Sequence, residues 1–261
     1  LIESAEGRKI YYPQAHTSAE KIGIADIVII FVKSTETKQA VQSALQVIGE
    51  QTIVMSLQNG YGNHLDIEEF VNSNQIVVGT TLQGATMKGA GEIFHAGTGE
   101  TAIGTRDNQN RFEEMIQTFQ RCGLPMNFEK DIFHIIFQKV IINVGINPVT
   151  AILRQPNRVV AENPSARNTA EKLITEAVEV LGAAGYKFDA KECIDKTMEV
   201  AIATGTNHSS MLQDIEKGRK TEIDKINGAI AKMAKEYQLE VPCNELIVEL
   251  VHGIENNSFA I

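Results

Sequence analysis

Three polar residues recur at every fourth position of one otherwise apolar segment. Lys139, Asn143 and Asn147 lie within FQKVIINVGINPVTA, residues 137–151, and the residues between them are all apolar. Because an α-helix turns about 100° per residue, these three side chains share one helical face. A lysine and two amides are costly to bury unless something hydrogen-bonds to them. The spacing therefore favours a face that binds a polar small molecule.

Two interpretations of this face stay open on the segment alone. Asn147 precedes Pro148, and asparagine before proline often marks only the end of a helix. Asn143 could pair with neighbouring backbone, and Lys139 could extend its ammonium group to water. The choice between a packing detail and an active site depends on the rest of the chain.

Composition narrows the class of protein. The 261 residues are 43% hydrophobic and 22% charged, typical of a globular protein, and 24 basic against 33 acidic residues leave a net charge of −9. This balance argues against nucleic acid or an anionic membrane as the main partner. No apolar run long enough for a transmembrane helix and no signal-peptide pattern are found. Cys122, Cys193 and Cys243 lack metal-ligand spacing, so we expect reduced thiols used in packing.

The first half of the chain alternates strand and helix patterns. Buried parallel strands are predicted at residues 25–33, 52–58 and 75–81. Amphipathic helices are predicted at 35–50, with Ser34 or Thr35 as its cap, at 65–71, and at 110–122, ending before Gly123. Residues 91–106 resemble a hairpin at the sheet edge, with Gly97 and Gly99 in its turn. The alternation predicts a doubly wound α/β sheet.

From residue 131 onward the strand patterns disappear. Helices are predicted over residues 131–147, 164–184, 190–204, 208–219, 221–237 and 244–253. The fold class is therefore α/β followed by all-α, with one domain at residues 1–130 and a helical domain at 131–261. A cleft between two such domains is a usual place for a ligand.

Polar or glycine-rich residues follow all three predicted strands. Lys33 ends the first strand, Asn59 and Gly60 follow the second, and the glycine-rich segment at residues 84–91 follows the third. Any one of them could merely turn the chain. Because ligands bind at the carboxyl ends of strands in open α/β sheets, their shared edge predicts a binding site.

A second polar cluster lies in NHSSMLQDIEKGRKTEID, residues 207–224. Ser209 and Ser210 precede an apolar run and are equally well explained as helix caps. Glu222 and Asp224 would ordinarily form a solvated face, and Asn157 in LRQPNR a turn. His134 and His208 lack partners at metal-ligand spacing, which favours packing or surface roles.

Across the whole chain, these pieces resemble one family. The segments FVKSTET, LQNGYGN, VGTTLQGA, FQKVIINVGINPVTAIL, QPN, NHSSMLQDI and TEIDKINGAI occur in the order seen in 2-dehydropantoate 2-reductases (ketopantoate reductases). The resemblance implies a Rossmann-like domain followed by a helical substrate-binding and dimerisation domain. It also implies NADPH-dependent reduction of 2-dehydropantoate to pantoate, a step of pantothenate biosynthesis, in the cytoplasm.

The resemblance also implies roles for single residues. Lys139 matches the catalytic proton donor. Substrate-binding positions are matched by Asn59, Asn143, Asn147, Asn157 and Ser210, and cofactor-binding positions by Lys33, Asn59, Ala85 and Glu222. A small-molecule 2-oxo acid is the implied substrate, no metal is expected, and a homodimer is a possible assembly.

One feature of the family has no counterpart in this sequence. No strand with a G-x-G-x-x-G turn precedes residues 25–33, and the early glycines, Gly7 and Gly23, lie in another context. The first βαβ unit is thus missing, which suggests either a fragment of a complete reductase or a truncated, cofactor-deficient binding module. A related reductase acting on another 2-oxo acid is a further alternative.

Overall fold

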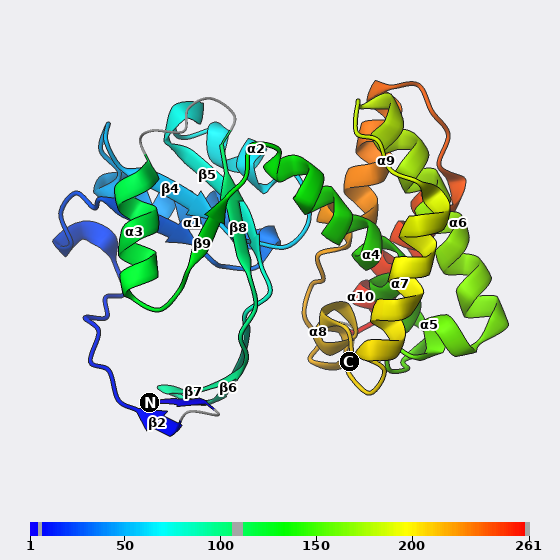
Figure 1. Ribbon diagram of the computed structural model, residues 1–261, viewed down its shortest axis with the longest axis horizontal. Helices are drawn as coiled ribbons and strands as arrows, with labels where there is room; N and C mark the ends of the chain where they lie inside the picture. The colour runs from blue at the N-terminus through cyan, green and yellow to red at the C-terminus, as the bar shows by residue number, and fades with distance from the viewer. Residues whose placement is uncertain (5–6, 106–111, 259–261) are drawn as a thin grey trace. The chain divides into compact units, whose positions relative to one another are not determined.

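The computed structural model describes residues 1–4, 7–105 and 112–258 (Figure 1). The chain divides into two compact units. Unit 1 comprises Leu1–Val32, Glu36–Gln58 and His64–Ile135, and unit 2 comprises Lys33–Thr35, Asn59–Asn63 and Ile136–Ile261. Two short segments that follow strands in the sequence, Lys33–Thr35 and Asn59–Asn63, therefore belong with the helical unit.

A five-stranded sheet in the order β3-β4-β5-β8-β9 forms the centre of unit 1. Strands β3 (Ile27–Ile30), β4 (Ile53–Ser56) and β5 (Ile76–Thr81) are parallel, as predicted. Strand β8 (Thr101–Gly104) runs antiparallel to β5, and β9 (Met126–Phe128) runs parallel to β8. The α/β prediction with a Rossmann-like sheet is confirmed.

Apolar side chains from the sheet and one helix form the core of unit 1. Helix α3 (Glu113–Arg121) brings Met115 against Met55 and Ile103, with Phe112 just before the helix in the same cluster. All four are at most 3% exposed. Residues 110 and 111, where this helix was expected to begin, lie outside the described residues. Gly123, at φ +77°, follows the helix end as predicted.

Two predictions about the first strand and helix were wrong in detail. Strand β3 is not fully buried, since it lies at one end of the strand order and Ile29 is 40% exposed. Helix α1 spans only Thr37–Ala44, and neither Ser34 nor Thr35 caps it, because the 3-10 turn Ser34–Glu36 precedes it. Further short elements are α2 (Asn63–Glu68) and the 3-10 turns Ala19–Lys21, Leu45–Val47 and Ser73–Gln75.

The predicted hairpin at residues 91–106 is also wrong. Strand β7 (Glu92–Gly97) pairs with β6 (Gly84–Gly89) in a separate four-stranded sheet of order β2-β1-β7-β6, whereas β8 belongs to the five-stranded sheet. Strands β1 (Ile2–Ser4) and β2 (Gly7–Lys9) complete that second sheet, reached by the long ribbon of β6 and β7 (Figure 1). A Cβ on Gly99 would lie 2.4 Å from Leu82 Cβ, so this glycine permits close packing instead of a hairpin turn.

The described residues of unit 2 form helices and the loops that connect them, without a strand. Its helices are α4 (Ile132–Leu153, whose first four residues belong to unit 1), α5 (Val159–Glu162), α6 (Pro164–Ala183), α7 (Ala190–Ala203), α8 (Ser210–Glu216), α9 (Asn227–Glu236) and α10 (Pro242–Ser258). A 3-10 turn, Ile223–Lys225, precedes α9. The predicted helices from residue 131 onward are confirmed, with shifted ends.

Helix α4 continues six residues beyond the predicted end at Asn147. Pro148 lies inside the helix and does not end it. Its length and composition alone would allow a membrane span, but 67% of its most apolar window is buried inside the protein. Gly145 allows this packing, since a Cβ there would lie 2.9 Å from Ile174 of α6 and 3.2 Å from Thr197 of α7. Helix α4 is thus a core helix.

The cysteines are free thiols, as expected. Cys193 and Cys243 are partly buried, and burial is the largest cause raising the pKa of each thiol. Cys122 is exposed at the end of α3, so the expectation that it packs in the core was wrong.

Candidate active site

The structure places all but one of the predicted site residues in unit 2. Those of unit 2 are Lys33, Asn59, Lys139, Asn143, Asn147, Asn157, Ser210 and Glu222. Ala85 is the exception: it lies on β6 in unit 1 and is exposed. The residues of unit 2 come from α4, α8, the segments Lys33–Thr35 and Asn59–Asn63, the turn between α4 and α5, and the loop before α9.

Helix α4 carries the predicted polar face. Between Lys139 and Asn147, the residues Val140, Ile141 and Val144 are at most 1% exposed, so the helix is anchored by its apolar side. Lys139 itself is partly buried. Burial lowers the pKa of the Lys139 ammonium, and the carboxylate of Glu222 partly opposes this by raising it. A lysine whose pKa is lowered by burial is suited to donate a proton near neutral pH.

Two adjacent serines separate into a structural and an exposed residue. Ser209 caps α8, accepting a hydrogen bond from the backbone N–H of Leu212 at 3.1 Å and one from Thr150 Oγ1 at 2.7 Å. Ser210 is exposed, and its Oγ lies 3.5 Å from Asn147 Nδ2. The capping interpretation therefore holds for Ser209 alone, and Ser210 joins the polar face of α4.

Asn157 is buried, and only one of its two polar side-chain atoms forms a hydrogen bond to another described residue. Its Nδ2 donates to Thr204 Oγ1 at 2.9 Å, and its backbone N–H donates to Asn207 O at the same distance. Among the residues that the structure describes, its buried side-chain carbonyl oxygen has no hydrogen-bond partner. Because such an acceptor is costly to leave unpaired, Asn157 is suited to receive a hydrogen bond from a ligand hydroxyl. Asn157 lies in a turn, as its sequence context suggests, and its side chain is buried there.

Glu222 is the centre of a buried polar cluster. It is 5% exposed, its Oε1 accepts from the backbone N–H of Ser34 at 3.1 Å, and its Oε2 lies 3.5 Å from Asn59 Nδ2 and 3.9 Å from Lys33 Nζ. The expectation of a solvated face was therefore wrong for Glu222. It holds for Asp224, which is exposed and pairs with His252 at 3.1 Å.

Asp214 was not among the predicted site residues, yet it contacts this cluster. Its Oδ2 lies 2.6 Å from Lys33 Nζ, and the residue is only 4% exposed. Asp214 follows Ser210 by four positions, so the two lie on one face of α8. That spacing was the available sequence signal.

A tight turn positions Asn59. Gly60 adopts φ +82°, and a Cβ at this position would lie 2.5 Å from Lys225 O. Next to it, Tyr61 donates its backbone N–H to the same oxygen at 2.8 Å and places its ring 4.7 Å from that of Phe137 on α4. The segment Asn59–Asn63 is thereby fixed to the helical unit.

Replacing Gly60 by alanine is expected to destabilise unit 2 more than replacing Gly218. Both have positive φ, which costs a non-glycine residue about 1–2 kcal/mol, but a Cβ on Gly218 meets nothing within 4 Å. Thermal unfolding midpoints would show a larger loss for Gly60→Ala. Equal losses would mean that the approach to Lys225 is unimportant.

A buried carboxylate of α10 holds the loop that carries Glu222. Glu255, 8% exposed, accepts from the backbone N–H of Thr221 at 2.7 Å. Thr221 Oγ1 in turn accepts from the backbone N–H of Ile223 at 3.2 Å. Both neighbours of Glu222 are thus fixed by hydrogen bonds.

Glu255→Ala is expected to lower the free energy of unfolding by about 1–3 kcal/mol, because it leaves the buried Thr221 N–H without this acceptor. Urea unfolding measures the loss. Glu249→Ala, at an exposed position of the same helix, is the control and should change little. A loss no larger than that of the control would contradict this role of Glu255.

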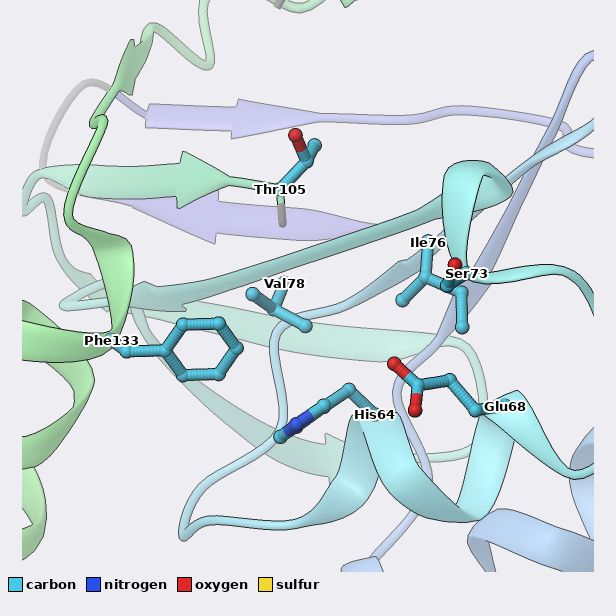
Figure 2. A pocket seen from close by; sticks show the side chains of 7 residues that line it. All are labelled: His64, Glu68, Ser73, Ile76, Val78, Thr105 and Phe133. Atoms are coloured by element: carbon cyan, nitrogen blue, oxygen red, sulfur yellow. The ribbon is translucent and has the colours of Figure 1, made fainter. Parts of the chain in front are cut away.

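A separate pocket lies within unit 1 (Figure 2). It is lined by His64, Glu68, Ser73, Ile76, Val78, Thr105 and Phe133. The rings of His64 and Phe133 lie 5.0 Å apart. No predicted site residue lines this pocket.

No metal centre is formed within the described part of the chain, where no group of three or more His, Cys, Asp or Glu residues could hold an ion. His208 is exposed and lies 3.0 Å from Glu216, in keeping with its expected surface role. The candidate site offers an ammonium group, amides, hydroxyls and carboxylates.

Both units of this chain are similar in sequence to known proteins. The pattern described as Ketopantoate reductase PanE/ApbA matches residues 1–108, and its C-terminal counterpart matches residues 131–255. The 2-dehydropantoate 2-reductase of Pyrococcus horikoshii is 37% identical over 235 residues, covering 88% of this chain and 76% of that protein. The one of Archaeoglobus fulgidus is 34% identical, covering 89% and 77%. A solved D-mandelate dehydrogenase with NADH and anilino(oxo)acetate is 26% identical, covering 92% and 80%, with a TM-score of 0.86.

The fold and these likenesses define the chain as an oxidoreductase of the class that acts on 2-oxo acids. Within this class, the chain belongs to the ketopantoate reductase PanE/ApbA family. The family membership predicted from the sequence motifs is thus confirmed.

Proposed function

We propose that this chain reduces 2-dehydropantoate to pantoate with NADPH, using Lys139 as the proton donor. The observation that carries this proposal is the placement of Lys139 on a polar face with Asn143 and Asn147, where burial lowers the pKa of Lys139 and the charge of Glu222 raises it. The names and identities of the two archaeal relatives support the substrate.

The residues of unit 2 suit the reaction. When a 2-oxo group gains a hydride at carbon, negative charge develops on its oxygen. The Lys139 ammonium would stabilise that charge and then transfer a proton to the oxygen. Asn147 and Ser210, 3.5 Å apart, would orient the substrate by hydrogen bonds, as would Asn143, and the unpaired acceptor of Asn157 would receive a substrate hydroxyl.

The residues present fit the charge and polarity of a nicotinamide dinucleotide. NADPH would supply the hydride when bound. Lys33 keeps 40% of its side chain exposed beside a buried carboxylate, so it can also face a phosphate group, and Asn59 offers an amide from the neighbouring segment. Ala85 and Glu222 remain proposed cofactor contacts.

Steady-state oxidation of NADPH and of NADH, followed with 2-dehydropantoate, tests the proposal. Turnover with NADPH is the expected result, and no turnover with either nucleotide would overturn it. The cofactor-deficient alternative is tested by calorimetry, since micromolar binding of NADPH would exclude it.

A second 2-oxo acid is a specific alternative substrate. The structural likeness to a D-mandelate dehydrogenase favours testing an aromatic 2-oxo acid such as benzoylformate beside 2-dehydropantoate. The ratio of the two kcat/KM values decides between them.

We propose a cytoplasmic enzyme, supported by free cysteines and by a buried α4. A homodimer is also proposed, for which Leu246 and Leu250 of α10, 62% and 49% exposed, offer an apolar contact. Light scattering of the purified protein tests the assembly.

A further inference from the structure

Four charged side chains of unit 2 form a series of alternating sign that ends at the proposed proton donor: Asp214, Lys33, Glu222 and Lys139. Asp214 contacts Lys33, with 2.6 Å between Oδ2 and Nζ. Lys33 Nζ also lies 3.9 Å from Glu222 Oε2, and Glu222 is the charged group that acts on Lys139. The two ammonium groups and two carboxylates sum to zero charge.

The Glu222 carboxylate therefore interacts with two lysines, Lys33 and Lys139, and the Asp214 carboxylate competes with it for Lys33. The Lys33 ammonium is much closer to Asp214 than to Glu222. Asp214 and Glu222 are both buried, at 4% and 5% exposed, so water screens their charges less than it screens the Lys33 ammonium, whose side chain is 40% exposed. Without the Asp214 charge, the nearest carboxylate for Lys33 would be Glu222.

We propose that Asp214 is a positioning residue. It holds the Lys33 ammonium away from Glu222, so that the negative charge of Glu222 stabilises the protonated side chain of Lys139. This inference rests on the proposed role of Lys139. Charged groups from each contributing segment take part: Lys33 from the segment after β3, Asp214 from α8 and Glu222 from the loop before α9. Asp214 thereby acts on the proton donor without touching the substrate.

Loss of the Asp214 charge should lower the pKa of Lys139. The cluster would then carry a net positive charge, which disfavours the protonated form of a neighbouring ammonium. Removing Lys33 as well restores neutrality and leaves the pair of Glu222 and Lys139. The double variant should therefore recover a pKa close to that of the wild type, which a purely structural role for Asp214 would not produce.

The experiment is an NMR titration of the lysine side chains in full-length protein labelled with ¹³C and ¹⁵N on lysine. The Lys139 signal is assigned by its absence in Lys139→Arg. Wild type, Asp214→Asn, Lys33→Met and the double variant Lys33→Met/Asp214→Asn are compared. Asp195→Asn, which removes the partner of Lys191 in an exposed pair on α7, is the control and should leave the Lys139 titration unchanged.

A downward shift in Asp214→Asn that is reversed in the double variant would support the proposal. An unchanged Lys139 pKa in Asp214→Asn, or the same lowering in Asp214→Asn and in the double variant, would overturn it. The titration needs neither cofactor nor turnover. Failure of the proposed reductase activity would appear only in the NADPH oxidation assay, so the two failures are distinguishable.

Discussion

Lys139→Ala is expected to lower kcat for 2-oxo acid reduction by about 10²–10⁴-fold, the usual contribution of a positioned proton donor. The affinity for NADPH should change little, because the role proposed for Lys139 is at the substrate oxygen. Stopped-flow or steady-state NADPH oxidation measures kcat, and calorimetry measures nucleotide affinity. Lys232→Ala, at an exposed position of α9, is the matched control. A kcat equal to that of the wild type would remove Lys139 from its proposed role.

The pH dependence of the wild type adds a test of the same residue. Because burial lowers the pKa of Lys139, kcat should fall with rising pH before the ordinary range of lysine titration is reached. Lys139→Arg should not show this fall, since arginine stays protonated. A profile that is flat up to the ordinary lysine range would contradict the assignment.

The same lowered pKa has a consequence for stability. In the folded protein Lys139 releases its proton at lower pH than in the unfolded chain, so its burial costs stability in full below the folded pKa. That cost decreases as pH rises from the folded pKa toward the unfolded value. Lys139→Met should thus be at least as stable as the wild type at pH 7, with the advantage shrinking at alkaline pH. Urea unfolding at several pH values separates this effect from the loss of activity.

Glu222→Gln is the second substitution with a large expected effect. It keeps an oxygen to accept from the Ser34 N–H but removes the charge that raises the pKa of Lys139. The protonated donor is then lost at lower pH, and we expect kcat to fall about tenfold at pH 8, with the alkaline limb of the profile displaced downward.

Glu236→Gln, on an exposed position of α9, is the control for the loss of one carboxylate. It should keep the wild-type profile. A Glu222→Gln variant with an unshifted pH profile would mean that Glu222 does not act on the proton donor, whatever its effect on nucleotide binding.

Sequence by itself determined the elements whose patterns are local. Strands β4 and β5 are continuous apolar runs, and both are buried parallel strands. The four-residue spacing of Lys139, Asn143 and Asn147 placed them on one helix, because helical periodicity is a property of neighbouring residues. The ordered motifs were specific enough to indicate the family.

Only the tertiary structure decided which strands pair and which caps form. Residues 91–106 resemble a hairpin, yet β7 and β8 belong to different sheets, since strand pairing depends on partners distant in the sequence. Pro148 suggested a helix end, but the packing of α4 carries the helix on to Leu153. Ser209 and Ser210 were equivalent in sequence, and the chain geometry at the start of α8 made only Ser209 its cap.

The contacts among the charged residues linked to the proposed proton donor could likewise not be predicted from the sequence. Lys33 and Asp214 are 181 positions apart, and Lys33 and Glu222 are 189 apart, so no local pattern brings them together. Glu222 reads as a surface residue in its own segment but is buried against Ser34, Asn59 and Lys33. The residue types that could do the chemistry are local information. Their burial and their charge partners, which set the pKa of Lys139, arise only when distant segments pack together.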